Sequence, residues 1–114
     1  MAGAGLLPEA RLRLERLVEE RPDWSAAHDL LGVILAGQGE TGPALEQFRR
    51  AVALEPRSAQ AQCNLGALLG RQGRFAQAVP YLEAAAGLGP DEPRYRAVLE
   101  QARRDLRRRP RPRP

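Results

Sequence analysis

The sequence is poor in the residue types that usually carry catalysis or bind metals. Its 114 residues include one cysteine and one histidine, and aromatic residues make up only 4%. A single cysteine excludes an internal disulfide and a cysteine-based metal cluster. No apolar run approaches the ~20 residues that a membrane span needs, and residues 1–7 lack the basic start of a signal peptide. We therefore expect a small cytoplasmic protein that is not an enzyme and holds no cofactor and no metal.

Lysine is absent, so all 18 basic residues are arginine, and the formal net charge is +4. The positive charge is concentrated in the last twelve residues, where seven arginines stand against Asp105 as the only acid. Residues 1–102 hold more acids than arginines and are slightly acidic. Prolines alternate with arginines over residues 109–114, which predicts an extended tail. Two interpretations stay open: the tail binds an anionic polymer such as nucleic acid in a salt-sensitive way, or it is a solvated linker.

Residue types recur at an offset of thirty-four positions along the chain. Pro22, Pro56 and Pro90 mark the repeat. Other pairs at this offset have the same or a compatible type: Leu31 and Leu65, Gly32 and Gly66, Leu35 and Leu69, Gly39 and Gly73, Ala44 and Ala78, Phe48 and Leu82, Ala51 and Ala85. Ala10, Leu14 and Leu17 continue the second half of the pattern towards the N-terminus. Self-similarity at a fixed period is typical of solenoid proteins.

The physical role of each recurring residue predicts a helical hairpin. Glycine inside a helix costs ~1 kcal/mol relative to alanine, so Gly32 and Gly66 indicate a close approach of a partner helix, with the small Ala44 and Ala78 expected opposite. Gly39 and Gly73 are expected in tight turns, and the recurring prolines end the second helix of each unit. Each unit is therefore helix, turn, helix and stop.

This pattern resembles the tetratricopeptide repeat (TPR) family over about residues 7–106. The unit over 25–58 and the unit over 59–92 both have the family's Leu-Gly pair, its later alanines and its final proline. His28 and Gln62 stand where the family has a Trp-like residue, a departure that predicts thinner packing of the first helices. The resemblance implies an all-α fold: a short right-handed superhelix of about six antiparallel helices.

We expect these helices over residues 8–20, 25–38, 42–54, 59–72, 75–88 and 92–108. The first is half a repeat, and the last is a capping helix because Glu100 replaces the repeat glycine. A flexible segment is expected over residues 1–6, and the TPR domain over 7–108. Pro8 is placed in a first turn, where its missing N–H is harmless, and Pro80 is expected to bend its helix.

Some finer features of the helices can also be expected. Asp23 and Thr41 are the expected caps of the second and third helices. A pair of Glu100 with Arg104 is expected on the outer face of the last helix. Five residues are its expected buried stripe: Tyr95, Val98, Leu99, Ala102 and Leu106.

In the TPR family the first helix of each unit lines a concave groove, and the resemblance implies that this groove binds a peptide or a helix of a partner protein. The groove positions that match are Ala26, Asp29, Val33, Gln60, Cys63, Asn64, Ala67, Arg71, Arg94, Ala97, Gln101 and Arg104. The arginines among them are expected to pair with acidic groups. The alternative is a shallow, solvated face. The clamp with which some family members hold a terminal carboxylate is not matched, because Asp29, Val33 and Val98 stand where cations and an amide are needed.

Isolated reactive residues have simpler structural interpretations. We expect His28 to pack between first helices with one nitrogen solvated. Cys63 is either a thiolate activated by Arg71 or, as we favour, a small apolar residue. Trp24 is expected to pack at the corner between the first two helices. Self-association through the first or last helix remains an alternative, so we expect a monomer or a weak homo-oligomer.

Overall fold

The computed structural model describes the backbone of residues 2–108 and the side chains of residues 7–108. Within these residues the chain forms helices and no strand, so the predicted all-α fold is confirmed. The helices are α1 (Ala2–Glu20), α2 (Ser25–Gly37), α3 (Thr41–Leu54), α4 (Ala59–Arg71), α5 (Phe75–Leu88) and α6 (Pro93–Arg108). From α2 onward the bounds differ from the expected ones by one residue at most. The expected tail over 109–114 lies outside the described residues.

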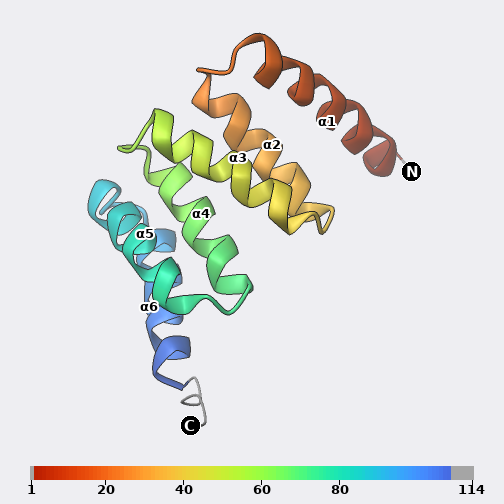
Figure 1. Cartoon of the computed structure of the whole chain (residues 1–114). Helices are drawn as coiled ribbons and strands as arrows, with labels where there is room; N and C mark the ends of the chain where they lie inside the picture. Colours follow the sequence, from red (N-terminus) through yellow and green to blue (C-terminus); the bar gives the residue numbers. More distant parts are fainter. Residues whose placement is uncertain (1, 109–114) are drawn as a thin grey trace, which may run out of the picture.

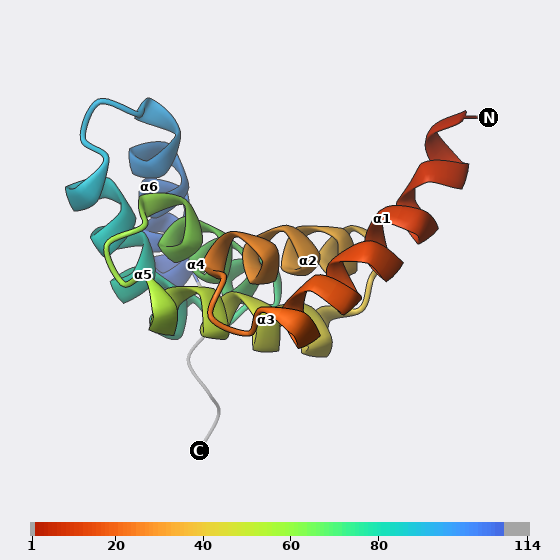
Figure 2. The ribbon, with the colours of Figure 1, turned by 90° about the horizontal axis from the view of Figure 1, so that it is seen from above.

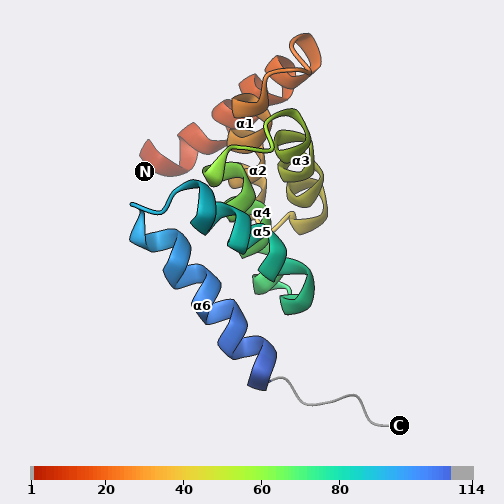
Figure 3. The same ribbon diagram turned by 90° about the vertical axis from the view of Figure 1, so that its left-hand side faces the viewer.

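The helices stack in chain order as an elongated solenoid of about 45 × 29 × 29 Å. Figure 1 shows the hairpins α2–α3 and α4–α5 side by side, with α1 at one end and α6 at the other. Figure 2, seen from above, shows α1 and α6 rising from the two ends, so the stack is concave on one side. In Figure 3 α6 runs beside α5 at the C-terminal end of the stack. None of the helices described is long and apolar enough to cross a membrane.

Each hairpin closes where a glycine of the first helix meets a bulky side chain of the second. A Cβ atom added at Gly32 would lie 2.5 Å from the Phe48 ring, and one at Gly66 would lie 2.7 Å from Leu82. The predicted close approach is confirmed at both positions. The nearest side chains are the bulky Phe48 and Leu82, because a glycine leaves room for a large side chain; at Gly66 the carbonyl oxygen of the expected Ala78 also lies 3.2 Å from the Cβ position.

The core follows the repeat along the whole stack. Ala44, Ala51, Ala78 and Ala85 on the second helices have no exposed surface. The recurring leucines of the first helices are buried as well: Leu31, Leu35, Leu65 and Leu69. The same small and large residues therefore pack each successive hairpin against the next.

Both hairpin turns use glycine in the left-handed region of the backbone. Gly39 has φ 81° and Gly73 has φ 78°, which other residues adopt only at a cost. The predicted caps were wrong. The N-cap residue of α2 is Trp24, not Asp23, and that of α3 is Glu40, so Thr41 is already helical.

His28 and Gln62 occupy equivalent positions and make the same hydrogen bond. The His28 Nε2 atom lies 2.8 Å from the carbonyl oxygen of Pro22, and Gln62 Nε2 donates to the carbonyl of Pro56 at 2.8 Å. The His28 Nδ1 atom also lies 2.7 Å from Oε1 of Gln47. Our expectation of one solvated nitrogen was wrong, because both nitrogens have protein partners and the side chain is 1% exposed.

The two terminal helices differ from our expectations in detail. Helix α1 begins at Ala2, whereas we expected a helix from residue 8 after a flexible segment, so Pro8 lies inside the helix and not in its first turn. In α6 the buried residues are Tyr95, Leu99 and Ala102. Val98 is half-buried, and Leu106 is 39% exposed, so Leu106 does not belong to the buried stripe.

Candidate functional site

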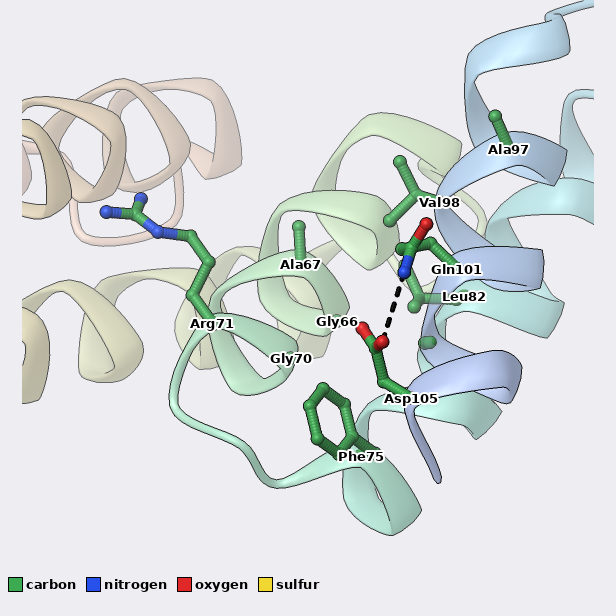
Figure 4. Close-up of a pocket in the computed structure, with 11 residues that line it drawn as sticks. Gly66, Ala67, Gly70, Arg71, Phe75, Leu82, Ala97, Val98, Gln101 and Asp105 are labelled. Carbon is green, nitrogen blue, oxygen red and sulfur yellow. Dashed lines mark hydrogen bonds between the residues drawn. The ribbon is translucent and has the colours of Figure 1, made fainter. Parts of the chain in front are cut away.

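The concave side of the solenoid carries a hollow between α4 and α6 with a volume of about 460 Å³. Figure 4 shows Ala67 of α4 facing Val98 and Gln101 of α6 across it, with Phe75 and Asp105 at its lower end. Its lining is mostly apolar and made of small residues: Gly66, Ala67, Gly70, Ala97, Val98 and Ala102, with Phe75 and Leu82 from α5. This volume is large enough for one bulky apolar side chain of a partner.

A second hollow of about 250 Å³ lies between α2 and α4. Val33 and Ala36 line it from α2, and Asn64 lines it from α4. Ala67 and Arg71 line both hollows. The two hollows are therefore neighbours on either side of α4, and together we call them the groove.

The small residues on α4 keep the groove open. A Cβ atom added at Gly70 would meet nothing within 4 Å, so this glycine is not required by the packing of the hairpin. Gly66 has the opposite surroundings, since its Cβ position is filled by Leu82. Two glycines on one helix therefore have different roles: Gly66 closes the hairpin, and Gly70 leaves space on the concave side.

Arg71 is the cation at the centre of the groove. It is exposed, and within residues 7–108 its guanidinium has no ion-pair or hydrogen-bond partner. Figure 4 shows its side chain extending from α4 on the side away from α6. A free guanidinium beside an apolar hollow is suited to bind a carboxylate that comes with an apolar side chain.

The C-terminal wall of the groove is held by hydrogen bonds along α6. Gln101 Nε2 donates to Asp105 Oδ1 at 3.0 Å, and Arg104 Nη2 donates to Gln101 Oε1 at 2.9 Å. Arg104, which we expected to pair with Glu100, thus bonds to Gln101. Arg94 lies over the ring of Tyr95, 5.2 Å from its centre.

Asp29 and Asn64 join α2 to α4 on the concave side. The Asn64 amide donates to both carboxylate oxygens of Asp29, at 2.9 Å and 3.0 Å. Burial raises the pKa of Asp29, and the hydrogen bond from Asn64 offsets part of this rise. The carboxylate therefore serves to connect two repeats, and its charge is held in partly apolar surroundings.

Cys63 lies in the core and has no features of a nucleophile. Its side chain is 7% exposed. Burial raises the pKa of the thiol, and Arg94, rather than the Arg71 that we expected, is the cation that partly opposes this rise. Among the described residues no three His, Cys, Asp or Glu side chains gather in an arrangement that could hold a metal ion.

The structure brings together about half of the expected site residues. Six of them line the groove: Val33, Asn64, Ala67, Arg71, Ala97 and Gln101. Ala26 and Gln60 are exposed on the first turns of α2 and α4, and Arg94 and Arg104 are exposed on α6, outside the lining of either hollow. Sequence reasoning missed Phe75 and Leu82, because they belong to a second helix, and Leu82 reaches the groove by filling the space of the missing Cβ atom of Gly66.

Comparisons with known proteins agree on the architecture. The family model described as tetratricopeptide repeat matches residues 30–93. A crystal structure of a MamA protein is similar with a TM-score of 0.83 and 23% identity, over 92% of this chain and 57% of that one. An O-GlcNAc transferase variant from Thermobaculum terrenum is similar with a TM-score of 0.78 and 33% identity, over 84% of this chain and 18% of that one. The chain thus spans less than two thirds of either protein. No curated protein sequence matches it significantly.

Proposed function

Because the chain belongs to the tetratricopeptide repeat family, we propose that it is a non-catalytic interaction module whose groove binds a peptide or a helix of a partner protein. Repeats of this family generally mediate contacts between proteins. The similarity to a transferase extends over only 18% of that enzyme's chain, so it gives no reason to assign a reaction here. A cytoplasmic location stays a prediction.

The proposal rests on one observation. The unpaired guanidinium of Arg71 lies between two hollows that are lined mainly by small and apolar residues. An apolar side chain of the partner enters the hollow between α4 and α6, where Ala67 and Val98 contact it. Transfer of such a side chain out of water contributes roughly 1.5–3 kcal/mol when burial is complete. A neighbouring acidic group of the partner pairs with Arg71. The expected ligand is therefore a segment that combines a bulky apolar residue with an acidic one.

The test is selection of displayed peptides against the full chain, followed by affinity measurements with two glycine variants. We expect the selected peptides to share an apolar and an acidic residue. Gly70→Glu fills the groove with a charged side chain and should weaken binding at least tenfold. The matched control is Gly87→Glu, because Gly87 is also a helical glycine whose Cβ would meet nothing within 4 Å, but lies on α5 outside the groove. This control should bind the peptides as the native chain does.

The same experiment separates the groove from the arginine-rich tail. If peptides bind equally well to the Gly70→Glu and native chains, the groove proposal is contradicted. If removal of residues 109–114 abolishes binding and moderate salt weakens it steeply, the tail is the binding element, and its affinity for nucleic acid becomes the next measurement.

A further inference from the structure

The groove offers few hydrogen-bonding partners to the backbone of a bound segment. The polar side chains that line it are Asn64, Arg71, Gln101 and Asp105. Asn64 already donates to Asp29, and Gln101 already donates to Asp105. Among these four side chains, Arg71 alone makes no hydrogen bond to another residue of the described range 7–108.

An extended segment needs more partners than this lining provides. Every residue of an extended chain except proline brings one N–H donor and one C=O acceptor, and burial of either group without a partner costs free energy. In an α-helix these groups bond to each other within the segment. A helix can therefore lie against the apolar lining without leaving its backbone unpaired. The composition of the groove thus favours a helix over an extended segment.

Helices α2, α4 and α6 have surfaces against which such a helix can pack. On α4 the small residues Ala67 and Gly70 allow a partner helix to approach closely. On α2 the side chains of Leu30 and Val33 are 56% and 47% exposed, and they lie about one turn apart. On α6 Val98 lines the groove from the other side. Apolar side chains spaced in this way form ridges, and the side chains of a packed helix fit between ridges.

Cations flank this apolar lining on both sides. Arg71 extends from α4 on the side away from α6 (Figure 4). On the side of α6, Arg104 donates to the groove residue Gln101 at 2.9 Å. Arg94 lies near α4, because its charge opposes the rise that burial causes in the pKa of the Cys63 thiol. All three arginines are exposed and can meet acidic groups of a ligand.

The carboxylates of the same surface are already hydrogen-bonded within the chain. Asp29 accepts two hydrogen bonds from Asn64, and Asp105 accepts one from Gln101. Asp29 is in addition half-buried between α2 and α4. The three exposed arginines therefore outnumber these two carboxylates, and the charge at the edges of the groove complements an acidic ligand.

We propose that the groove binds an amphipathic α-helix of a partner protein, which turns an apolar face toward Ala67 and Gly70 and carries acidic residues along both edges of that face. This inference rests on the function proposed for the groove and deepens it, because it specifies the conformation of the ligand and the position of its charges.

The probes are two synthetic peptides of two heptads each, labelled with a fluorophore. Both have leucine along one face, and a hydrocarbon staple on the opposite face keeps them helical, which circular dichroism verifies. One has glutamate and the other lysine at the positions that flank the leucines. In fluorescence anisotropy with the full chain, the glutamate peptide should bind at least about tenfold more tightly than the lysine peptide. Equal binding of the two peptides, or binding of neither, would overturn the proposal.

Charge reversal on the protein locates the binding site. Arg71→Glu should weaken binding of the glutamate peptide roughly threefold to tenfold and strengthen binding of the lysine peptide. The matched control is Arg49→Glu, which makes the same change in net charge at an exposed position of α3 outside both hollows, and it should bind as the native chain does. Gly70→Glu should weaken both peptides. Circular dichroism verifies that each variant is folded. Equal binding of the glutamate peptide by Arg71→Glu and the native chain would contradict the proposal.

The conformation of a bound peptide separates this inference from the proposed function. An isotope-labelled peptide from the displayed selection should show helical chemical shifts when it is bound. Proline at an outward-facing position inside this peptide should abolish binding. If the peptide loses binding to Gly70→Glu but is extended when bound, the helix is overturned as the ligand and the groove remains the binding site.

Two other occupants are outcomes of the same measurements. Removal of residues 109–114 should leave the preference for the glutamate peptide in place, and its disappearance would show that the tail binds this peptide. Light scattering of the chain without peptide should give a mass that does not grow with concentration. Growth of the mass that Gly70→Glu suppresses would identify a second copy as the occupant. Either result would overturn the proposal.

Discussion

His28 and Gln62 are equivalent residues in successive repeats, and they make the same hydrogen bond with different chemical groups. His28 is an imidazole and Gln62 an amide, yet each bonds to the carbonyl of the proline six residues earlier. The sequence alone identified the two positions as equivalent and as a departure from the family's Trp-like residue. It did not reveal the hydrogen bond, because the acceptor is a backbone carbonyl, which leaves no signal in the residue types.

The two glycines of α4 should respond in opposite ways to alanine. Gly66→Ala places a methyl group 2.7 Å from Leu82 and 3.2 Å from the carbonyl oxygen of Ala78, so we expect a loss of roughly 1–3 kcal/mol in the free energy of unfolding. Gly70→Ala meets nothing and gains helix propensity, so we expect a gain of roughly 0.5–1 kcal/mol. Urea denaturation measures both. Equal effects of the two substitutions would mean that the hairpins do not close at Gly66.

The partly buried carboxylate of Asp29 should make stability depend on pH. Its pKa is raised in the folded chain above the ordinary 3.8, so the folded state holds the proton more tightly than the unfolded one. This contribution to stability is present at acidic pH and is lost as the pH rises through the raised pKa. Asp29→Asn stays neutral and can still accept a hydrogen bond from Asn64.

We therefore expect the Asp29→Asn variant to unfold at a higher urea concentration than the native chain at pH 7. The difference should close as the pH falls below the ordinary pKa of the carboxyl group. A variant that is less stable than the native chain at pH 7 would show that the hydrogen bonds from Asn64 outweigh the cost of burying the charge.

At the scale of helices, the thirty-four-residue offset was sufficient to predict where most elements begin and end. The offset predicted the bounds from α2 onward to within one residue, because glycine turns and proline stops recur at fixed places. It was weaker at both ends of the chain. Helix α1 begins at Ala2, six residues before the start that we expected, and Leu106 is apolar but 39% exposed.

Two leucine substitutions on α6 test whether the buried stripe of this helix includes Leu99 but not Leu106. Leu99 is 6% exposed, so Leu99→Ala should cost about 2–4 kcal/mol in the free energy of unfolding. Leu106 is 39% exposed, and Leu106→Ala should cost less than about 1 kcal/mol. Thermal or urea unfolding of the two variants side by side gives the comparison. Similar losses would place Leu106 back in the buried stripe.

At the scale of the whole molecule, repetition determines which surfaces remain free. In each complete hairpin the apolar side chains between its two helices are buried. Small residues remain on the concave side, where α2, α4 and α6 form the groove. The groove's position and six of its lining residues could be predicted from the family resemblance. Phe75 and Leu82 could not be predicted, because they belong to a second helix, and the contact that brings Leu82 against Gly66 depends on packing in three dimensions.

The two end helices of the described stack, α1 and α6, have different surfaces. The half repeat at α1 leaves an apolar face, whereas α6 ends the stack with the charged residues Arg96, Glu100 and Arg103 on its outer side. Solenoids need such a polar end to remain in solution. The two ends of the described stack are therefore chemically different.

The most direct measurement of the central claim is a map of amide chemical shifts in the full chain on titration with a selected peptide. Binding in the groove predicts changes at Ala67, Arg71, Ala97 and Gln101, and unchanged signals on the outer side of α3 and α5. Changes confined to α1, or to residues 109–114, would contradict the assignment of the groove as the binding surface.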